Sequence, residues 1–296
     1  MKLFKGSGVA IVTPFKEGNV DYEKLTELIK WHIEEGTDAI VVAGTTGESA
    51  TLSKAEKLEL FRHSMKVSEG KIQIIAGTGS NNTQESISLS VEAEKIGVQG
   101  LLLVTPYYNK PSQRGLYAHY KTIAEAVSIP IILYNVPGRT SVDLKPETVI
   151  ELSKIHNILG LKEASGDVAR IRPLAEALPA DFMIYAGNDG EIVDVLESGG
   201  HGVISVLANI VPKEVHQITE DYFSGNLEAA RRSQDSYQKL IDALFSDTNP
   251  VPVKAAMNYM GMEVGGLRLP LVEMDDENHQ KLKTVLMEYG LLEDVN

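Results

Sequence analysis

Eight short runs of β-branched and apolar residues recur along the first three quarters of the chain. Each run is nearly continuous rather than alternating, which is typical of strands that are covered on both faces, as in parallel sheets. The runs are Val9–Thr13, Ala39–Val42, Ile72–Ala76, Gly100–Val104, Ile131–Tyr134, Ile158–Lys162, Phe182–Ala186 and Gly202–Ser205. The pattern therefore predicts eight parallel strands.

The segments between these runs carry helical periodicity. In the first of them, Leu25, Leu28 and Ile29 fall on one helical face, and in the second Ser53 and Glu56 have the spacing of a capping box. Eight strands that alternate with helices predict an α/β fold, a (β/α)8 TIM barrel. A doubly wound open sheet is the alternative, and the lack of a Gly-rich phosphate loop after the first run disfavours it.

The pattern changes after about Ser224. Three helices without intervening strands are predicted at Asn226–Phe245, Pro250–Met260 and Asp276–Gly290. We therefore expect residues 1–224 to form the catalytic barrel and residues 225–296 to form a C-terminal three-helix extension. The extension is expected to pack on the barrel, or alternatively to cover an interface.

Composition narrows the class of protein. The 296 residues carry a net charge of −13, so nucleic acid and anionic membrane surfaces are disfavoured as partners. No cysteine is present, which excludes disulfides and a thiolate nucleophile. The sequence contains no apolar run of about 20 residues, and its start does not have the pattern of a signal peptide. We expect a cytoplasmic protein without a membrane partner.

Lys162 is the most unusual side chain at a predicted strand end, because it follows the apolar run Ile158–Leu161. Active sites of TIM barrels form at the C-terminal ends of the strands. A lysine buried there loses hydration of its ammonium group, and a neutral amine can attack a ketone to form an imine. The alternative is a structural ion pair with Glu163, although adjacent residues of a strand point to opposite faces.

Other strand ends supply further candidates, each with an ordinary structural alternative. Tyr134 ends the neighbouring strand and has a phenol that can move protons, or it simply packs. Thr45 and Thr46 lie in a glycine-bracketed loop that can hold a carboxylate, or that needs small residues for its turn. Tyr108 is either a catalyst or an interface residue, and Arg139 either binds a carboxylate or is solvated.

The seven histidines are scattered, with no short-spaced pair that could ligate a metal. We therefore expect a metal-independent reaction without a cofactor.

Six motifs together resemble one family, the dihydrodipicolinate synthases, within the pyruvate-dependent class I aldolases. The similarity covers essentially the whole chain. Its carriers are Gly44-Thr-Thr-Gly-Glu-Ser49, Ile75-Ala-Gly-Thr-Gly79, Thr105-Pro-Tyr-Tyr-Asn-Lys-Pro111, Tyr134-Asn-Val-Pro-Gly-Arg-Thr140, Gly160-Leu-Lys-Glu-Ala164 and Gly187-Asn-Asp189.

The resemblance implies an activity: condensation of pyruvate with L-aspartate 4-semialdehyde, through a Schiff base on lysine, in lysine and diaminopimelate biosynthesis. It also implies the residue roles. Lys162 forms the Schiff base, and Tyr134, Thr45 and Tyr108 form a proton relay in which Tyr108 reaches into a neighbouring subunit. The substrate-binding positions are Thr46 for the pyruvate carboxylate, Arg139 for the semialdehyde carboxylate, and backbone groups at Gly187 and Ile204.

Oligomerisation and regulation follow from the same resemblance. Family members are commonly homotetramers built as dimers of dimers. The positions that match an allosteric lysine site are Ser49, Ala50, Asn81, Glu85 and Tyr107. Two positions that are histidine in lysine-inhibited members are Lys54 and Lys57 here. Extra cations beside a cationic ligand oppose its binding, which predicts weak or absent lysine feedback.

Two other functions compete with this interpretation. Sialate lyases and related sugar-acid lyases resemble the same barrel and lysine but lack Arg139 and its neighbours, so the aldehyde is the discriminating substrate. A catalytically silent barrel that senses a ligand is the third hypothesis, and the presence of Lys162, Tyr134 and Thr45 together argues against it.

Overall fold

Eight parallel strands close into a barrel in the computed structural model, which describes residues 2–293. Going round the barrel, the order is β1-β10-β9-β8-β7-β6-β5-β4, and β4 pairs with β1 to close it. The strands are β1 (Gly6–Ala10), β4 (Ala39–Val42), β5 (Gln73–Gly77), β6 (Gly100–Val104), β7 (Ile131–Asn135), β8 (Ile158–Glu163), β9 (Met183–Ala186) and β10 (Gly202–Ser205). The predicted TIM barrel is confirmed.

The first strand was placed wrongly. It was expected at Val9–Thr13 and lies at Gly6–Ala10, because Gly6 and Ser7 pair with Gly202 and Val203 of β10 although neither residue favours strands. Beyond Ala10, the amide of Val12 donates instead to the Asn209 side chain. The chain then forms a small hairpin, β2 (Phe15–Lys16) and β3 (Asn19–Val20), that sequence reasoning missed.

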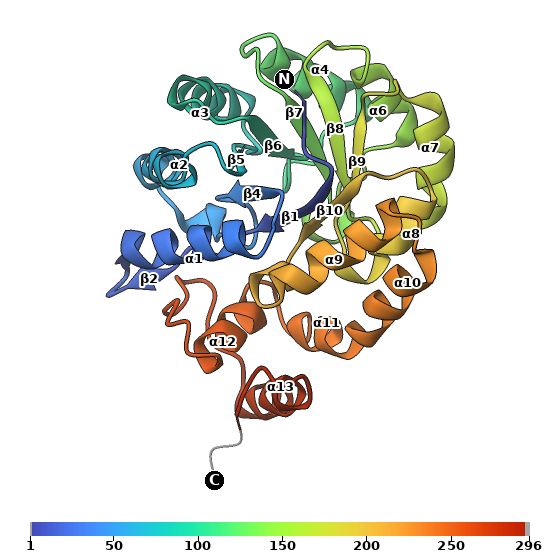
Figure 1. Cartoon of the computed structure of the whole chain (residues 1–296). Coiled ribbons are helices and arrows are strands. Elements are labelled where there is room, and N and C mark those ends of the chain that lie inside the picture. The colour runs from blue at the N-terminus through green and yellow to red at the C-terminus, as the bar shows by residue number, and fades with distance from the viewer. Residues whose placement is uncertain (1, 294–296) are drawn as a thin grey trace.

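Helices surround the barrel (Figure 1). Ser53 and Glu56 form the expected capping box at the start of α2. The helices that follow the strands are α1 (Tyr22–Glu34), α2 (Lys54–Ser68), α3 (Thr83–Ile96), α4 (Gln113–Ala124), α5 (Pro137–Thr140), α6 (Pro146–Leu152), α7 (Ile171–Ala177), α8 (Ile192–Glu197) and α9 (Pro212–Phe223). Short 3-10 turns lie at Ser49–Thr51, Val168–Arg170, Asp189–Glu191 and Leu207–Asn209.

The core has two layers, as a barrel requires. Side chains that point outward from the strands pack against the helices, while a separate inner cluster fills the barrel. Phe4 belongs to the inner cluster, where its ring stacks on Tyr185 with 4.4 Å between ring centroids. The inner cluster also contains Tyr134 and Ile204, which places these two candidate residues inside the barrel.

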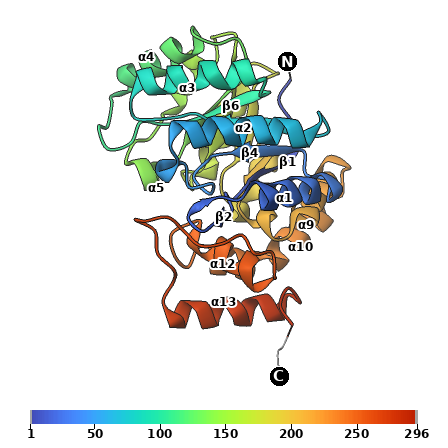
Figure 2. The same ribbon diagram turned by 90° about the vertical axis from the view of Figure 1, so that its left-hand side faces the viewer.

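Four helices follow α9 in the described chain, rather than the expected three. The predicted helix Asn226–Phe245 is divided at Tyr237 into α10 (Leu227–Ser236) and α11 (Gln238–Leu244), and it is followed by α12 (Val251–Tyr259) and α13 (Asp276–Glu288). Helix α10 packs on α9, and α13 packs on both α11 and α12 at the outer end of the extension (Figures 1 and 2). The division at residues 224 and 225 stays a prediction; Met1 and residues 294–296 lie outside the described residues.

Candidate active site

Lys162 and Tyr134 lie side by side inside the barrel mouth. They are register partners on β8 and β7, so both side chains point the same way, and the Lys162 Nζ lies 4.5 Å from the centre of the Tyr134 ring. Lys162 is only 4% exposed. The sequence prediction of a buried lysine at the end of a strand is therefore confirmed.

Lys162 does not pair with Glu163. The Glu163 carboxylate points out of the barrel, where it accepts hydrogen bonds from Asn135 Nδ2 at 3.1 Å and from the Ser165 amide at 2.8 Å. Burial raises the pKa of Glu163, and these hydrogen bonds and nearby Arg170 oppose the rise. The amine of Lys162 is thus left for other chemistry.

A polar network behind the site fixes the ends of β7 and β8. Asn135 Nδ2 also donates to Asp143 Oδ1 at 2.9 Å, and Arg170 binds both oxygens of Asp143 at 2.8 and 3.1 Å. The Arg170 guanidinium holds the pKa of Asp143 below its usual range. Because Asn135 and Glu163 directly follow Tyr134 and Lys162, this network orients the two strand ends that carry them.

A buried carboxylate lies close enough to Lys162 to sense its charge. Asp189 accepts hydrogen bonds from the Ser205 hydroxyl at 2.5 Å and from the amides of Val206 and Leu207 at 3.0 and 2.9 Å. Burial raises the pKa of Asp189, and the Lys162 cation is among the groups that oppose the rise. Asp189 therefore fixes the chain that follows β10, next to Ile204.

Gly187 allows the chain after β9 to lie directly against the end of β8. Its amide donates to the Glu163 carbonyl at 2.7 Å, and a Cβ built on Gly187 would meet the Ala164 Cβ at 2.5 Å. Only glycine fits this close approach.

The loop after β4 brings Thr45 and Thr46 to the same mouth. Thr45 is half-buried and lines the cavity, whereas Thr46 is buried and its Oγ1 accepts a hydrogen bond from Asn249 Nδ2 at 3.0 Å. Asn249 belongs to the C-terminal extension, 203 residues further along the chain. Its own Oδ1 is buried without a hydrogen-bond partner among the described residues.

A cavity of about 810 Å³ opens above this site. It is lined by Thr45, Tyr134 and Arg139, three of the predicted site residues. It extends to Ser49, Ala50, Glu85 and Tyr107, four of the five positions expected to match a lysine site, and to Lys54 and Lys57. Lys162, Thr46, Gly187, Ile204 and Asn81 are not part of its lining. Asn81 nevertheless contacts a lining residue, because its Nδ2 donates to the Tyr107 carbonyl at 3.2 Å.

Arg139 lies on α5, the short helix that follows β7. One guanidinium nitrogen donates to the Asn249 carbonyl at 3.1 Å. Arg139 is nevertheless an exposed residue, and it lines the same cavity as Tyr134. A positive, accessible group at this place can bind an anionic part of a ligand.

Tyr108 does not line the cavity of its own chain. It is 89% exposed and has a left-handed backbone, with φ of 71°. The loop that carries it is held by Asn109, whose Nδ2 donates to the Asn81 carbonyl at 2.9 Å. The structure therefore does not bring Tyr108 together with Tyr134 and Thr45 within one chain.

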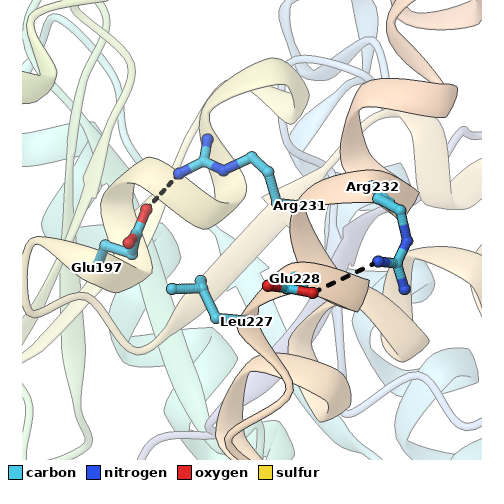
Figure 3. A pocket seen from close by; sticks show the side chains of 5 residues that line it. All are labelled: Glu197, Leu227, Glu228, Arg231 and Arg232. Atoms are coloured by element: carbon cyan, nitrogen blue, oxygen red, sulfur yellow. Dashed lines mark hydrogen bonds and ion pairs between the residues drawn. The ribbon is translucent and has the colours of Figure 1, made fainter.

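The C-terminal extension supplies cavity residues that sequence reasoning missed. They are Thr248, Asn249, Pro250, Pro270 and Leu271. No motif in the sequence marks them, because they reach the mouth only through tertiary packing. A second hollow, of about 400 Å³, lies between Glu197 and α10 (Figure 3). Arg231 pairs there with Glu197, and Arg232 pairs with Glu228. The charged side chains of this hollow are therefore already paired with one another.

Two properties of residues 2–293 bear on other functions. These residues contain no group of three or more histidine, aspartate or glutamate side chains placed to hold a metal ion. None of the helices described is both long and apolar enough to cross a bilayer.

Comparison with known proteins decides the family. A model of the dihydrodipicolinate synthetase family matches residues 3–289. The chain belongs to this family. It is 52% identical, over the full length of both chains, to 4-hydroxy-tetrahydrodipicolinate synthase of Thermoanaerobacter sp. (strain X514).

Solved structures of the family superpose over nearly the whole chain. The lysine-bound enzyme from Cyanidioschyzon merolae has a TM-score of 0.96 at 42% identity, and covers 99% of this chain and 100% of its own. The chloride-inhibited dihydrodipicolinate synthase from Acinetobacter baumannii, complexed with pyruvate, has a TM-score of 0.95 at 45% identity, and covers 97% of this chain and 99% of its own. The family resemblance seen in the motifs is confirmed.

Proposed function

We propose that this chain condenses pyruvate with L-aspartate 4-semialdehyde to give 4-hydroxy-tetrahydrodipicolinate, the first committed step of lysine and diaminopimelate biosynthesis. The observation that carries this proposal is the buried Lys162 beside Tyr134, which lines the same cavity as Arg139. Membership of the dihydrodipicolinate synthetase family supports it, as does the name of the Thermoanaerobacter relative.

Lys162 begins the reaction by attacking the ketone carbon of pyruvate through Nζ. Loss of water gives an imine, which withdraws electrons from the methyl group and makes it acidic. The Tyr134 oxygen accepts a methyl proton, and the resulting enamine carbon attacks the aldehyde carbon of the second substrate. The aldehyde oxygen takes up a proton and becomes the hydroxyl group of the product. The amino group of the former semialdehyde then attacks the imine carbon, which closes the ring and releases the free Lys162 amine. No metal or organic cofactor takes part in these steps.

The other site residues bind the substrates and transfer protons. Thr45, which lines the cavity near Tyr134, and Tyr108 complete the proton relay. Thr46 binds the pyruvate carboxylate. Backbone groups of Gly187 and Ile204 line the pocket that holds this substrate. Arg139 binds the carboxylate of the semialdehyde, which distinguishes this substrate from a neutral sugar aldehyde.

Tyr108 acts in the site of a second copy under this proposal. Its 89% exposure and its absence from the cavity of its own chain support that role. We propose a homotetramer, a dimer of dimers, which works in the cytoplasm. Sedimentation analysis of wild type and of Tyr108→Phe tests the assembly separately from the chemistry.

The outer part of the cavity contains positions that match an allosteric lysine site, so it determines whether lysine inhibits the protein. Lys54 donates to Ser88 Oγ at 2.7 Å, and burial lowers the pKa of Lys57 while Glu85 opposes that shift. We propose that lysine binds weakly or not at all between Ser49, Ala50, Asn81, Glu85 and Tyr107, because both lysines border the space it would fill.

A substrate swap tests the proposed activity. Purified protein is given pyruvate with aspartate semialdehyde, or with N-acetylmannosamine, and pyruvate consumption is measured. Turnover with the semialdehyde alone is expected. Turnover with the sugar alone would assign the chain to sialate-lyase chemistry, and no turnover with either aldehyde would favour a ligand-sensing barrel.

A further inference from the structure

A buried ion pair joins the C-terminal extension to the loop that carries Thr45 and Thr46. The Lys254 Nζ on α12 lies 2.8 Å from Glu48 Oε1, across 206 residues of sequence. Lys254 is 1% exposed and Glu48 is 4% exposed. The site proposed above does not use either charge, although burying two charges carries a large desolvation cost.

Lys254 also binds two chain segments that lie next to this loop. Besides Glu48, its ammonium donates to the Thr13 carbonyl at 3.0 Å and to the Gly266 carbonyl at 2.5 Å. The Thr13 hydroxyl in turn donates to the Gly47 carbonyl at 2.7 Å. One cation therefore ties together the chain after β1, the loop after β4 and the segment after α12.

Glu48 has a backbone conformation that needs such support. Its φ is +55°, in the left-handed region that a residue with a side chain rarely adopts. Strained residues of this kind persist at functional sites only where surrounding contacts fix them. Here Lys254 holds Oε1, and the amide of Arg268 donates to Oε2 at 3.0 Å.

The strained residue lies two positions after Thr46, in the same turn as the functional threonines. The Glu48 amide donates to the Thr45 carbonyl at 3.1 Å, so a change in Glu48 moves the turn that contains Thr45 and Thr46. Gly47 leaves little room for adjustment, because a Cβ there would lie 3.2 Å from Thr13 Oγ1 and from the Ile11 carbonyl oxygen. The turn is thus held rigidly from one side by a residue of the extension.

We infer that Lys254 and Glu48 are positioning residues, which set the placement of Thr45 and Thr46 and make the C-terminal extension part of the reaction site. This inference rests on the proposed function, because it assigns the two threonines to pyruvate binding and proton transfer. Neither Lys254 nor Glu48 touches the reacting atoms in this account.

The test compares Lys254→Met, Glu48→Gln and the double variant in the full-length protein. Each single variant leaves one buried group without its partner and is expected to lower the thermal midpoint, whereas the double variant removes the unpaired charge and recovers most of it. The KM for pyruvate is nevertheless expected to stay raised about tenfold in the double variant, because misplaced binding groups lose their orientation. The KM for the semialdehyde is expected to stay within about twofold, since Arg139 binds it from another loop.

A matched control separates positioning from general stability. Arg231→Met removes a cation of the same extension, on α10, whose partners Asp194 and Glu197 do not line the cavity of the proposed site. Figure 3 shows Arg231 with Glu197. Arg231→Met is expected to keep both KM values. A double variant that regains both its thermal midpoint and the wild-type KM for pyruvate would overturn the inference, because the pair would then be structural only.

Glu48→Asp keeps the test decisive should the neutral variants fail to fold. Aspartate preserves the charge beside Lys254 but is one methylene shorter, so it is expected to pull the loop and raise the KM for pyruvate. An unchanged KM in folded Glu48→Asp would contradict the inference. Failure of the proposed function is recognised separately, because wild type itself would then show no turnover of pyruvate with aspartate semialdehyde.

Discussion

The Lys162 amine faces the ring of Tyr134, its register partner on the neighbouring strand, with Nζ 4.5 Å from the ring centre. This arrangement places a nucleophile and a proton-transfer group on neighbouring strands, inside a barrel whose inner cluster also contains the stacked rings of Phe4 and Tyr185. Rigid strands fix both groups before any substrate arrives, which is the geometry that proton transfer beside an imine requires.

Tyr134→Phe tests the phenol directly. The ring that packs against Lys162 is retained and only the hydroxyl is removed, so folding is expected to be preserved. Loss of general acid–base catalysis is expected to lower kcat by about 10²- to 10³-fold, with a small change in the KM for pyruvate. Steady-state kinetics check this. A kcat within about twofold of wild type would show that another group moves the proton.

Arg139→Met tests the anion-binding role. The variant loses the charge and the hydrogen bond to the Asn249 carbonyl, but keeps a long apolar stem. The KM for aspartate semialdehyde is expected to rise about 10- to 100-fold, as for a lost charge-assisted hydrogen bond, while pyruvate binding is retained. Kinetics with each substrate varied in turn measure both values. An equal rise in both KM values would place the effect in folding rather than in substrate selection.

Lysine inhibition is expected to be weak. Lys54 and Lys57 border the outer cavity, so a cationic ligand meets like charges there. Inhibition of wild type by sub-millimolar lysine would contradict this. Replacing both residues with histidine is expected to strengthen inhibition, and Lys71→His, at an exposed lysine paired with Glu69, serves as the control.

His32 is expected to make stability depend on pH. It is fully buried on α1, where burial lowers its pKa from 6.5 to about 3. Its Nδ1 lies 3.0 Å from the Thr37 hydroxyl. The unfolded chain therefore binds a proton at pH 5 that the folded chain does not, so stability is lost as pH falls from about 6.5 towards 3.

His32→Asn keeps a polar atom near Thr37 and removes the titration. Between pH 7 and pH 5 it is expected to lose about 2 kcal/mol less stability than wild type. Urea unfolding at the two pH values measures this difference. Equal losses in wild type and variant would show that His32 is not responsible.

Sequence reasoning located the barrel because each strand is buried on both faces, which leaves a continuous apolar run. Lys162 stood out for the same reason, as a charge at the end of such a run. The first strand was misplaced because Gly6 and Ser7 gain their strand conformation from pairing with β10, not from local preference. The break at Tyr237 has no proline or glycine to mark it.

The contribution of the extension to the site had no local signal at all. Asn249 and Lys254 lie more than 200 residues from their partners Thr46 and Glu48, and an isolated sequence does not show which distant segments meet. Lysine, moreover, is ordinarily an exposed residue, so a second buried lysine was not expected. The motif around Thr45 was recognised, but the residues that hold it in place were visible only in three dimensions.

Trapping the pyruvate imine tests the central claim most directly. The protein is treated with borohydride in the presence of pyruvate, digested and mapped by mass spectrometry, with Lys162→Arg as the matched variant. The account predicts a reduced pyruvate adduct on Lys162, none on the fully hydrogen-bonded Lys254, and loss of the adduct and of activity in Lys162→Arg. An adduct on another lysine, or turnover by Lys162→Arg, would contradict it.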